Sequence, residues 1–111
     1  MRFSRELVKG STGLVVLSLL QERPMYGYEI VQVVNERTGG RLTWKEGSLY
    51  PCLHRLETDG YVSSRWQEAS NGRRRKYYRL TSRGRTALAS RTKEWVAFSG
   101  AVNVLLWGAK A

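Results

Sequence analysis

The hydrophobic positions in the first third of this 111-residue chain follow helical spacing. Residues 4–21 become apolar nearly all round in their second half, which predicts a helix buried on most sides, and Pro24 should stop it. Residues 26–38 carry apolar side chains every three or four positions, and the Gly-Gly pair that follows suits a left-handed helix end. Two helices are therefore expected before residue 41.

A third helix is expected from Ser48, as its N-cap, to Gly60. Pro51 would then occupy the third helical position, where a backbone N–H has no partner within the helix in any case. Three leucines share one face and should point into the core: Leu49, Leu53 and Leu56. The opposite face carries Ser48, Pro51 and Arg55, with Tyr50, His54 and Thr58 on its flanks.

Two segments with strand character follow, residues 61–68 and 73–80. The four residues between them end in Asn71-Gly72, and Asn-Gly is the strongest short-range hairpin signal because both residues tolerate positive φ. A two-stranded hairpin is therefore predicted. Alternation puts Val62, Trp66, Tyr78 and Leu80 on one side, and Arg73, Arg75, Tyr77 and Arg79 on the other.

Residues 82–106 return to helical spacing, with Thr81 or Ser82 as the N-cap. Five apolar side chains lie seven, three, four and three residues apart, which is the seam of a helix that packs along another helix. Trp107 would extend this seam, whereas Trp44 and Trp66 are expected in the core or against the hairpin. The predicted dimer interface consists of Leu88, Trp95, Phe98, Val102 and Leu105.

The net charge of +10 is concentrated in the second half of the chain. Residues 1–60 hold eight basic and seven acidic side chains, leaving +1, whereas residues 61–111 hold eleven against two, leaving +9. Seven of these basic residues, and no acidic one, fall between Arg73 and Arg85. A local excess of this size attracts polyanions, nucleic acid first among them.

Three helices followed by a basic hairpin form an α+β, mostly α, arrangement with one core, the winged helix-turn-helix. In such a fold the third helix enters a DNA major groove and the hairpin reaches neighbouring phosphates. Residues 1–80 would then form the DNA-binding domain and residues 81–111 a C-terminal dimerisation helix. The expected DNA contacts are Ser48, Tyr50, Pro51, His54, Arg55, Arg73, Arg74, Arg75, Lys76 and Tyr77.

Three separated motifs resemble the PadR family of bacterial transcriptional regulators: YGYEI at 26–30, EGSLYPCLHRLETDGYV at 46–62 and RRKYYRLTSRG at 74–84. The resemblance covers nearly the whole chain, and the single C-terminal helix is similar to the smaller subfamily. It implies a homodimeric repressor of nearby genes that binds a palindromic operator and is released by a small molecule or a stress signal. It says little about which effector that is.

The remaining candidate chemistry is sparse. Cys52 is the single cysteine, so it is expected to be structural, with redox sensing as the alternative. Neither a metal site, a cofactor site nor a catalytic constellation is recognisable around His54, the single histidine, or elsewhere, so an enzyme is not expected. The apolar run at 14–20 is too short to span a membrane, and a cytoplasmic location is expected.

Two questions stay open at this stage. Trp95, on the predicted seam, is either an ordinary interface anchor or one wall of a slot for a planar aromatic effector between two subunits. The basic character also suits an RNA-binding or nucleoid-associated module that reads shape rather than sequence. A winged helix used only for protein contacts is a further alternative.

Overall fold

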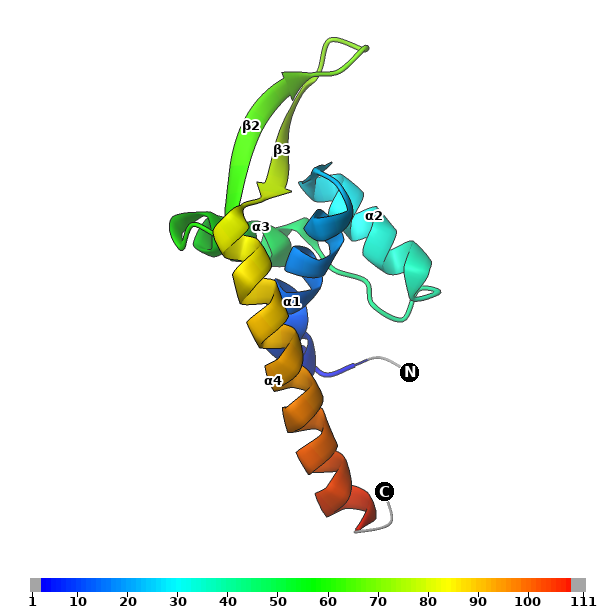
Figure 1. The fold of residues 1–111 in the computed structure, drawn as a ribbon. Coiled ribbons are helices and arrows are strands. Elements are labelled where there is room, and N and C mark those ends of the chain that lie inside the picture. The colour runs from blue at the N-terminus through cyan, green and yellow to red at the C-terminus, as the bar shows by residue number, and fades with distance from the viewer. Residues whose placement is uncertain (1–2, 109–111) are drawn as a thin grey trace.

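Over residues 3–108, which the computed structural model describes, the chain forms four helices and three strands (Figure 1). The first two residues of the predicted DNA-binding domain (1–2) and the last three of the predicted dimerisation helix (109–111) lie outside this range. The molecule is elongated, 56 × 32 × 21 Å, with a hairpin at one end and the last helix reaching the other. The elements are α1 (Arg5–Glu22), β1 (Met25–Tyr26), α2 (Gly27–Arg37), α3 (Glu46–Thr58), β2 (Val62–Glu68), β3 (Arg74–Leu80) and α4 (Ser82–Trp107).

The core forms where α1, α2, α3 and the base of the sheet meet the first turns of α4. Helix α1 begins one residue later than predicted because Ser4 caps it, its Oγ accepting a hydrogen bond from the Leu7 N–H. The expected burial of Trp44 and of the α3 leucines is confirmed, and in α1 it holds for Leu17, Leu19 and Leu20 of the second half, whereas Leu7 is 63% exposed. The fully buried side chains are Val16, Leu17, Met25, Ile30, Leu49, Leu53 and Val62.

The turn after α1 contains a strand that helical spacing did not predict. Met25 and Tyr26 form β1 and pair antiparallel with Tyr78 and Tyr77 of β3, which makes a three-stranded sheet in the order β1-β3-β2. Helix α2 therefore begins at Gly27 and not at Tyr26. A pairing across fifty residues of sequence leaves no local periodic signal, so the short strand resembled the first turn of the helix.

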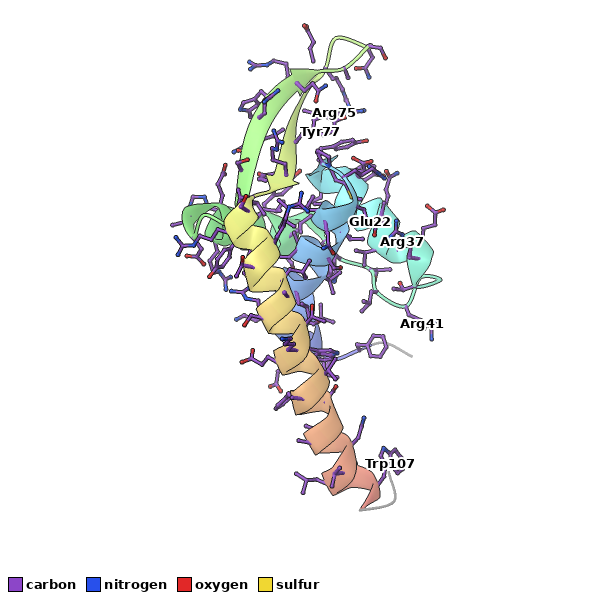
Figure 2. The ribbon with its side chains drawn as sticks, viewed as in Figure 1. Glu22, Arg37, Arg41, Arg75, Tyr77 and Trp107 are labelled. Carbon is purple, nitrogen blue, oxygen red and sulfur yellow. The ribbon has the colours of Figure 1, made fainter. Side chains whose placement is uncertain are left out.

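Helices α1 and α2 are also joined by an ion pair between their last residues, Glu22 and Arg37. The guanidinium of Arg37 donates two hydrogen bonds to the Glu22 carboxylate, at 2.6 and 2.7 Å (Figure 2). The pair is exposed, and the hydrogen bonds from Arg37 lower the pKa of Glu22. Its contribution is mainly to orientation, because exposed ion pairs add little to stability.

Helix α3 begins two residues earlier than its predicted N-cap. Lys45 holds the cap position in extended backbone, and its carbonyl accepts hydrogen bonds from the N–H groups of Ser48 and Leu49, at 3.0 and 3.1 Å. Ser48 is therefore a helical residue, and Pro51 lies in the second turn rather than the first. The missing N–H of Pro51 leaves the Gly47 carbonyl without its usual helical partner, on the exposed side of the helix.

The predicted hairpin is confirmed, with a different turn at its tip. Ala69 accepts from the Gly72 N–H and donates to the Arg73 carbonyl, which closes a three-residue loop. Of these residues Gly72 alone has positive φ, 81°, while the Asn71 Oδ1 accepts from the Arg73 N–H. Gly72 thus supplies the positive φ that the loop needs, and Asn71 supplies a side-chain hydrogen-bond acceptor. Strand β3 begins after the loop, at Arg74.

The base of the hairpin is locked to the start of α4 by a close backbone approach. A Cβ on Gly84 would lie 2.0 Å from the Tyr61 carbonyl oxygen, so only glycine fits there. Thr81, the N-cap of α4, donates through its N–H to that same carbonyl at 3.1 Å, and its Oγ1 accepts from the Gly84 N–H at 3.0 Å. These contacts fix the direction in which α4 leaves the sheet.

We predict that Gly84→Ala lowers the free energy of unfolding by at least about 2 kcal/mol, because a rigid backbone carbonyl occupies the space of the new methyl group. Gly10→Ala is the matched control, since its Cβ meets nothing within 4 Å on the exposed side of α1 and alanine favours a helix by up to about 1 kcal/mol. Urea unfolding measures both. Equal stability of the two variants would contradict the account of this junction.

Candidate nucleic-acid interface

The residues predicted to contact DNA from α3 do form one exposed surface. Ser48, Tyr50, Pro51, His54 and Arg55 are all exposed, whereas the three α3 leucines are buried beneath them. This separation follows from the helical period, because residues three, four and seven apart share a face. The surface holds hydroxyl, imidazole and guanidinium groups, which can donate hydrogen bonds to phosphate oxygens and form hydrogen bonds with base edges.

Tyr50 has a second role that joins α3 to α2. A Cβ on Gly27 would lie 2.6 Å from the Tyr50 hydroxyl oxygen and 2.8 Å from its ring, so the ring packs directly on the first residue of α2. The side chain is still 43% exposed. Burial, and then the nearby negative charge of Glu46, raise the pKa of Tyr50, so its hydroxyl remains a donor at neutral pH.

One face of the hairpin turns toward α3. Val62, Tyr78 and Leu80 lie on it and are buried, as predicted, while Trp66 shares the face but is 56% exposed. The reason is register: Val62 pairs with Leu80 over the core, whereas Trp66 pairs with Lys76 beyond the core's edge.

The cations on this face are held by other side chains of the chain itself. The Arg74 guanidinium lies 5.3 Å from the Trp66 ring centroid. The Lys76 amine lies 4.0 Å from a carboxylate oxygen of Glu57 in α3, and the other oxygen of that carboxylate accepts from the Ser64 hydroxyl at 2.5 Å. The basic run therefore has an acidic neighbour in space that its own segment of sequence does not show.

The other face of the hairpin carries Arg75 and Tyr77, together with Arg65 and Arg79. The Arg75 guanidinium lies 4.5 Å from the ring centroid of Tyr26, which packs edge-on against Tyr77 at 5.4 Å (Figure 2). Arg65 was not among the predicted contacts. Its position opposite Tyr77 in the register is the signal that could have identified it, because directly paired residues share a face.

A hollow of about 430 Å³ lies where α3, the start of α2 and the hairpin come together. Tyr26 and Gly27, which are far from the hairpin in the sequence, share the wall of the hollow with Tyr50 of α3 and with residues of the hairpin. The lining residues are Tyr26, Gly27, Tyr50, Trp66, Arg74, Arg75, Lys76 and Tyr78.

Cys52, on α3, is half-buried. Burial raises the pKa of its thiol, and the positive charges of Arg55 and Arg91 offset this only in part. Arg91 and Arg83 lie over the ring of Tyr61, at 5.1 and 5.7 Å from its centroid. Within residues 3–108, three or more acidic, histidine or cysteine side chains nowhere gather in a metal-binding arrangement.

The second half of α4 is apolar and exposed. Trp95, Phe98 and Leu105 of the predicted interface are 46%, 63% and 85% exposed, and Val102 is half-buried. Leu88 departs from the prediction because it is 5% exposed and packs in the chain's own core, where the first turns of α4 cross the other elements. The spacing missed further exposed apolar residues on the same helix: Val96, Val104 and Leu106.

The described part of the chain contains no helix of sufficient length and apolar character to cross a membrane. Its three helices, two-stranded wing and long last helix define a winged helix-turn-helix protein. The sequence profile of the PadR-like family of transcriptional regulators matches residues 16–90. The chain belongs to this family.

Two proteins of known structure are similar to this chain in fold and sequence, and a further regulator is similar in sequence. A transcriptional regulator from Clostridium thermocellum is 34% identical with a TM-score of 0.83, covering 91% of this chain and 95% of that one. A PadR family transcriptional regulator from Eggerthella lenta is 34% identical with a TM-score of 0.81, covering 91% and 86%. The transcriptional regulator Rv3488 of Mycobacterium tuberculosis is 38% identical over 84 residues, which are 76% of this chain and 75% of its own length.

We predict that Cys52 reacts with iodoacetamide more slowly than free cysteine at pH 8, because its raised pKa leaves less thiolate. The rate should keep increasing with pH beyond the point at which free cysteine levels off. Mass spectrometry of the alkylated protein across a pH series measures this, with the urea-unfolded chain as the control. A native rate equal to that of the unfolded chain would contradict the assigned environment.

Proposed function

We propose that the protein is a homodimeric, DNA-binding transcriptional repressor of nearby genes that recognises a palindromic operator. The observation that carries the proposal is that the polar side of α3 is exposed and that its Tyr50 lines one hollow with Arg74, Arg75 and Lys76 of the wing. Helix α3 would enter the major groove while the wing reaches the adjoining phosphates. Such a regulator would work in the bacterial cytoplasm.

The α3 residues are suited to reading base edges. Arg55 is exposed near the C-terminal end of α3 and offers a bidentate donor for guanine, while Ser48 and His54 offer smaller hydrogen-bonding groups. Arg73, Arg74 and Arg75 at the start of the second wing strand would hold the phosphate backbone and set the register. An RNA-binding or nucleoid-associated role shares the charge but does not require this polar helix face.

The second half of α4 supports the dimer. An apolar surface that includes two tryptophans and a phenylalanine is costly to leave in water, and the matching surface of a second copy can cover it. Trp95, Phe98, Val102 and Leu105 would then form the interface, and Leu88 would not. In this division residues 1–80, together with the first turns of α4, form the DNA-binding unit and the rest of residues 81–111 the dimerisation helix.

Release by a small molecule or a stress signal would act through the distance between the two recognition helices, which the α4 pair sets. Two copies of Trp95 near the two-fold axis would offer a slot for a planar aromatic effector.

We predict that a duplex carrying the promoter of its own gene binds the protein specifically in an anisotropy titration. Arg74→Gln combined with Arg75→Gln should weaken binding of all duplexes alike and reduce the salt slope by up to about two, because each phosphate contact contributes about 0.9. Lys93→Gln, which removes one positive charge from the middle of α4, is the control for Arg74→Gln and Arg75→Gln made one at a time.

Competition separates the proposal from its rivals. The promoter duplex should displace bulk DNA and should outcompete structured RNA. A folded dimer that binds all three equally at low salt would point to a nucleoid-associated or RNA-binding module instead. An arginine variant with unchanged regulatory activity would favour a winged helix that makes protein contacts only.

We predict that Phe98→Asp converts the dimer to a monomer in sedimentation equilibrium, because the new carboxylate would be buried against its symmetry mate. Ala89→Asp, on the exposed side of α4 near its start, is the matched control and should remain dimeric. A Phe98→Asp protein that keeps the wild-type mass would contradict the proposed interface.

A further inference from the structure

We propose that the hollow between α3 and the wing is a binding site for a free purine nucleotide, which would compete there with operator DNA. The competition, though not the binding itself, rests on the proposed function. The hollow measures about 430 Å³, within the range of roughly 300–1,000 Å³ common to small-molecule sites.

The walls of the hollow contain more aromatic side chains than contact with the phosphate backbone of duplex DNA would require. Four of the eight lining residues are tyrosine or tryptophan. Trp66 and Tyr50, from the wing and from α3, are 56% and 43% exposed, so each presents surface to a ligand. Exposed aromatic rings of this kind stack on nucleobases in other proteins.

The same hollow holds positive charge for a phosphate group. Arg74, Arg75 and Lys76 all line it, and none of the eight lining residues is acidic. Glu57 offsets the charge of Lys76 from behind, and the Arg74 guanidinium lies against the Trp66 ring, whereas the Arg75 guanidinium lies over Tyr26 on the other face of the hairpin. The planar guanidinium of Arg74, held in this way, presents its N–H groups to an anion with less entropy left to lose.

A nucleotide matches the two features together better than a duplex does. In a duplex the base faces are stacked on one another and only their edges are open, so the phosphate backbone would use the cations and no base would stack on the exposed surfaces of Trp66 and Tyr50. A free nucleotide offers an open base face and a phosphate in one small molecule.

A nucleotide and operator DNA could not bind at the same time, because they would use some of the same residues. Tyr50, Arg74, Arg75 and Lys76 line the hollow and are also proposed DNA contacts. A bound nucleotide would place its negative charge where a DNA phosphate has to lie. It would therefore weaken DNA binding without any change in the dimer.

The direct test uses AMP and the full-length protein without DNA, followed by NMR of the tryptophan indole N–H groups and the backbone amides. AMP should bind saturably and shift the Trp66 indole signal, with adenosine and inorganic phosphate each at least about tenfold weaker. Trp66→Ala should weaken AMP binding about tenfold, and Trp66→Phe by less, because a smaller ring remains. Tyr28→Ala is the matched control, since this exposed tyrosine of α2 does not line the hollow.

AMP that binds no better than phosphate, or equally well to the Trp66→Ala variant, would overturn the proposal. So would a single-stranded oligonucleotide that binds through Trp66 when AMP does not. Because this titration contains no duplex, its result is independent of whether the protein recognises an operator.

Competition tests the second half of the proposal. The apparent Kd of the promoter duplex should increase linearly with AMP concentration and show no plateau. A plateau would mean a separate AMP site and would overturn direct competition. DNA binding that is intact and insensitive to saturating AMP would refute the inference and leave the proposed function standing.

Discussion

The packing of the Tyr50 ring on Gly27 is the contact on which the proposed DNA-binding surface depends. It brings the first residue of α2 against the second turn of α3 at a distance that no side chain on residue 27 would permit. The residue before it, Tyr26, pairs with the wing strand β3. One short segment, Tyr26-Gly27, thereby sets both the angle between the two helices and the place of the wing beside them.

Much of the positive charge is organised before any partner arrives. Lys76 forms an ion pair with Glu57. The guanidiniums of Arg74 and Arg75 lie over the rings of Trp66 and Tyr26, and those of Arg83 and Arg91 both lie over the ring of Tyr61. These contacts reduce the repulsion within a basic run and restrict side chains that would otherwise lose entropy on binding. The preformed surface suits specific recognition better than a flexible basic tail would.

The sequence predicted most elements whose signals are local, and missed features set by pairs of distant residues or by the conformation of the backbone. Helical spacing located α1, α2 and α4 to within about a residue, and Asn71-Gly72 located the hairpin. Strand β1 was missed because its partner lies fifty residues away, and the N-cap of α3 was misplaced because Ser48 has the preferred side chain whereas Lys45 has the capping backbone. Leu88 fits the heptad pattern equally well whether the surface it packs against is its own core or a second copy.

The candidate interface was predictable as a list of residues but not as a shape. Its α3 and wing members are exposed together, yet the hollow between them, the Glu57–Lys76 ion pair and the place of Arg65 depend on tertiary packing and strand register. The central claim is that α3 and the wing bind DNA as one surface. Hydrogen exchange with and without a bound promoter duplex tests it most directly: slower exchange in both 46–58 and 62–80, with the second half of α4 unchanged, is the predicted result. Slower exchange limited to α4, or to the wing without α3, would contradict it.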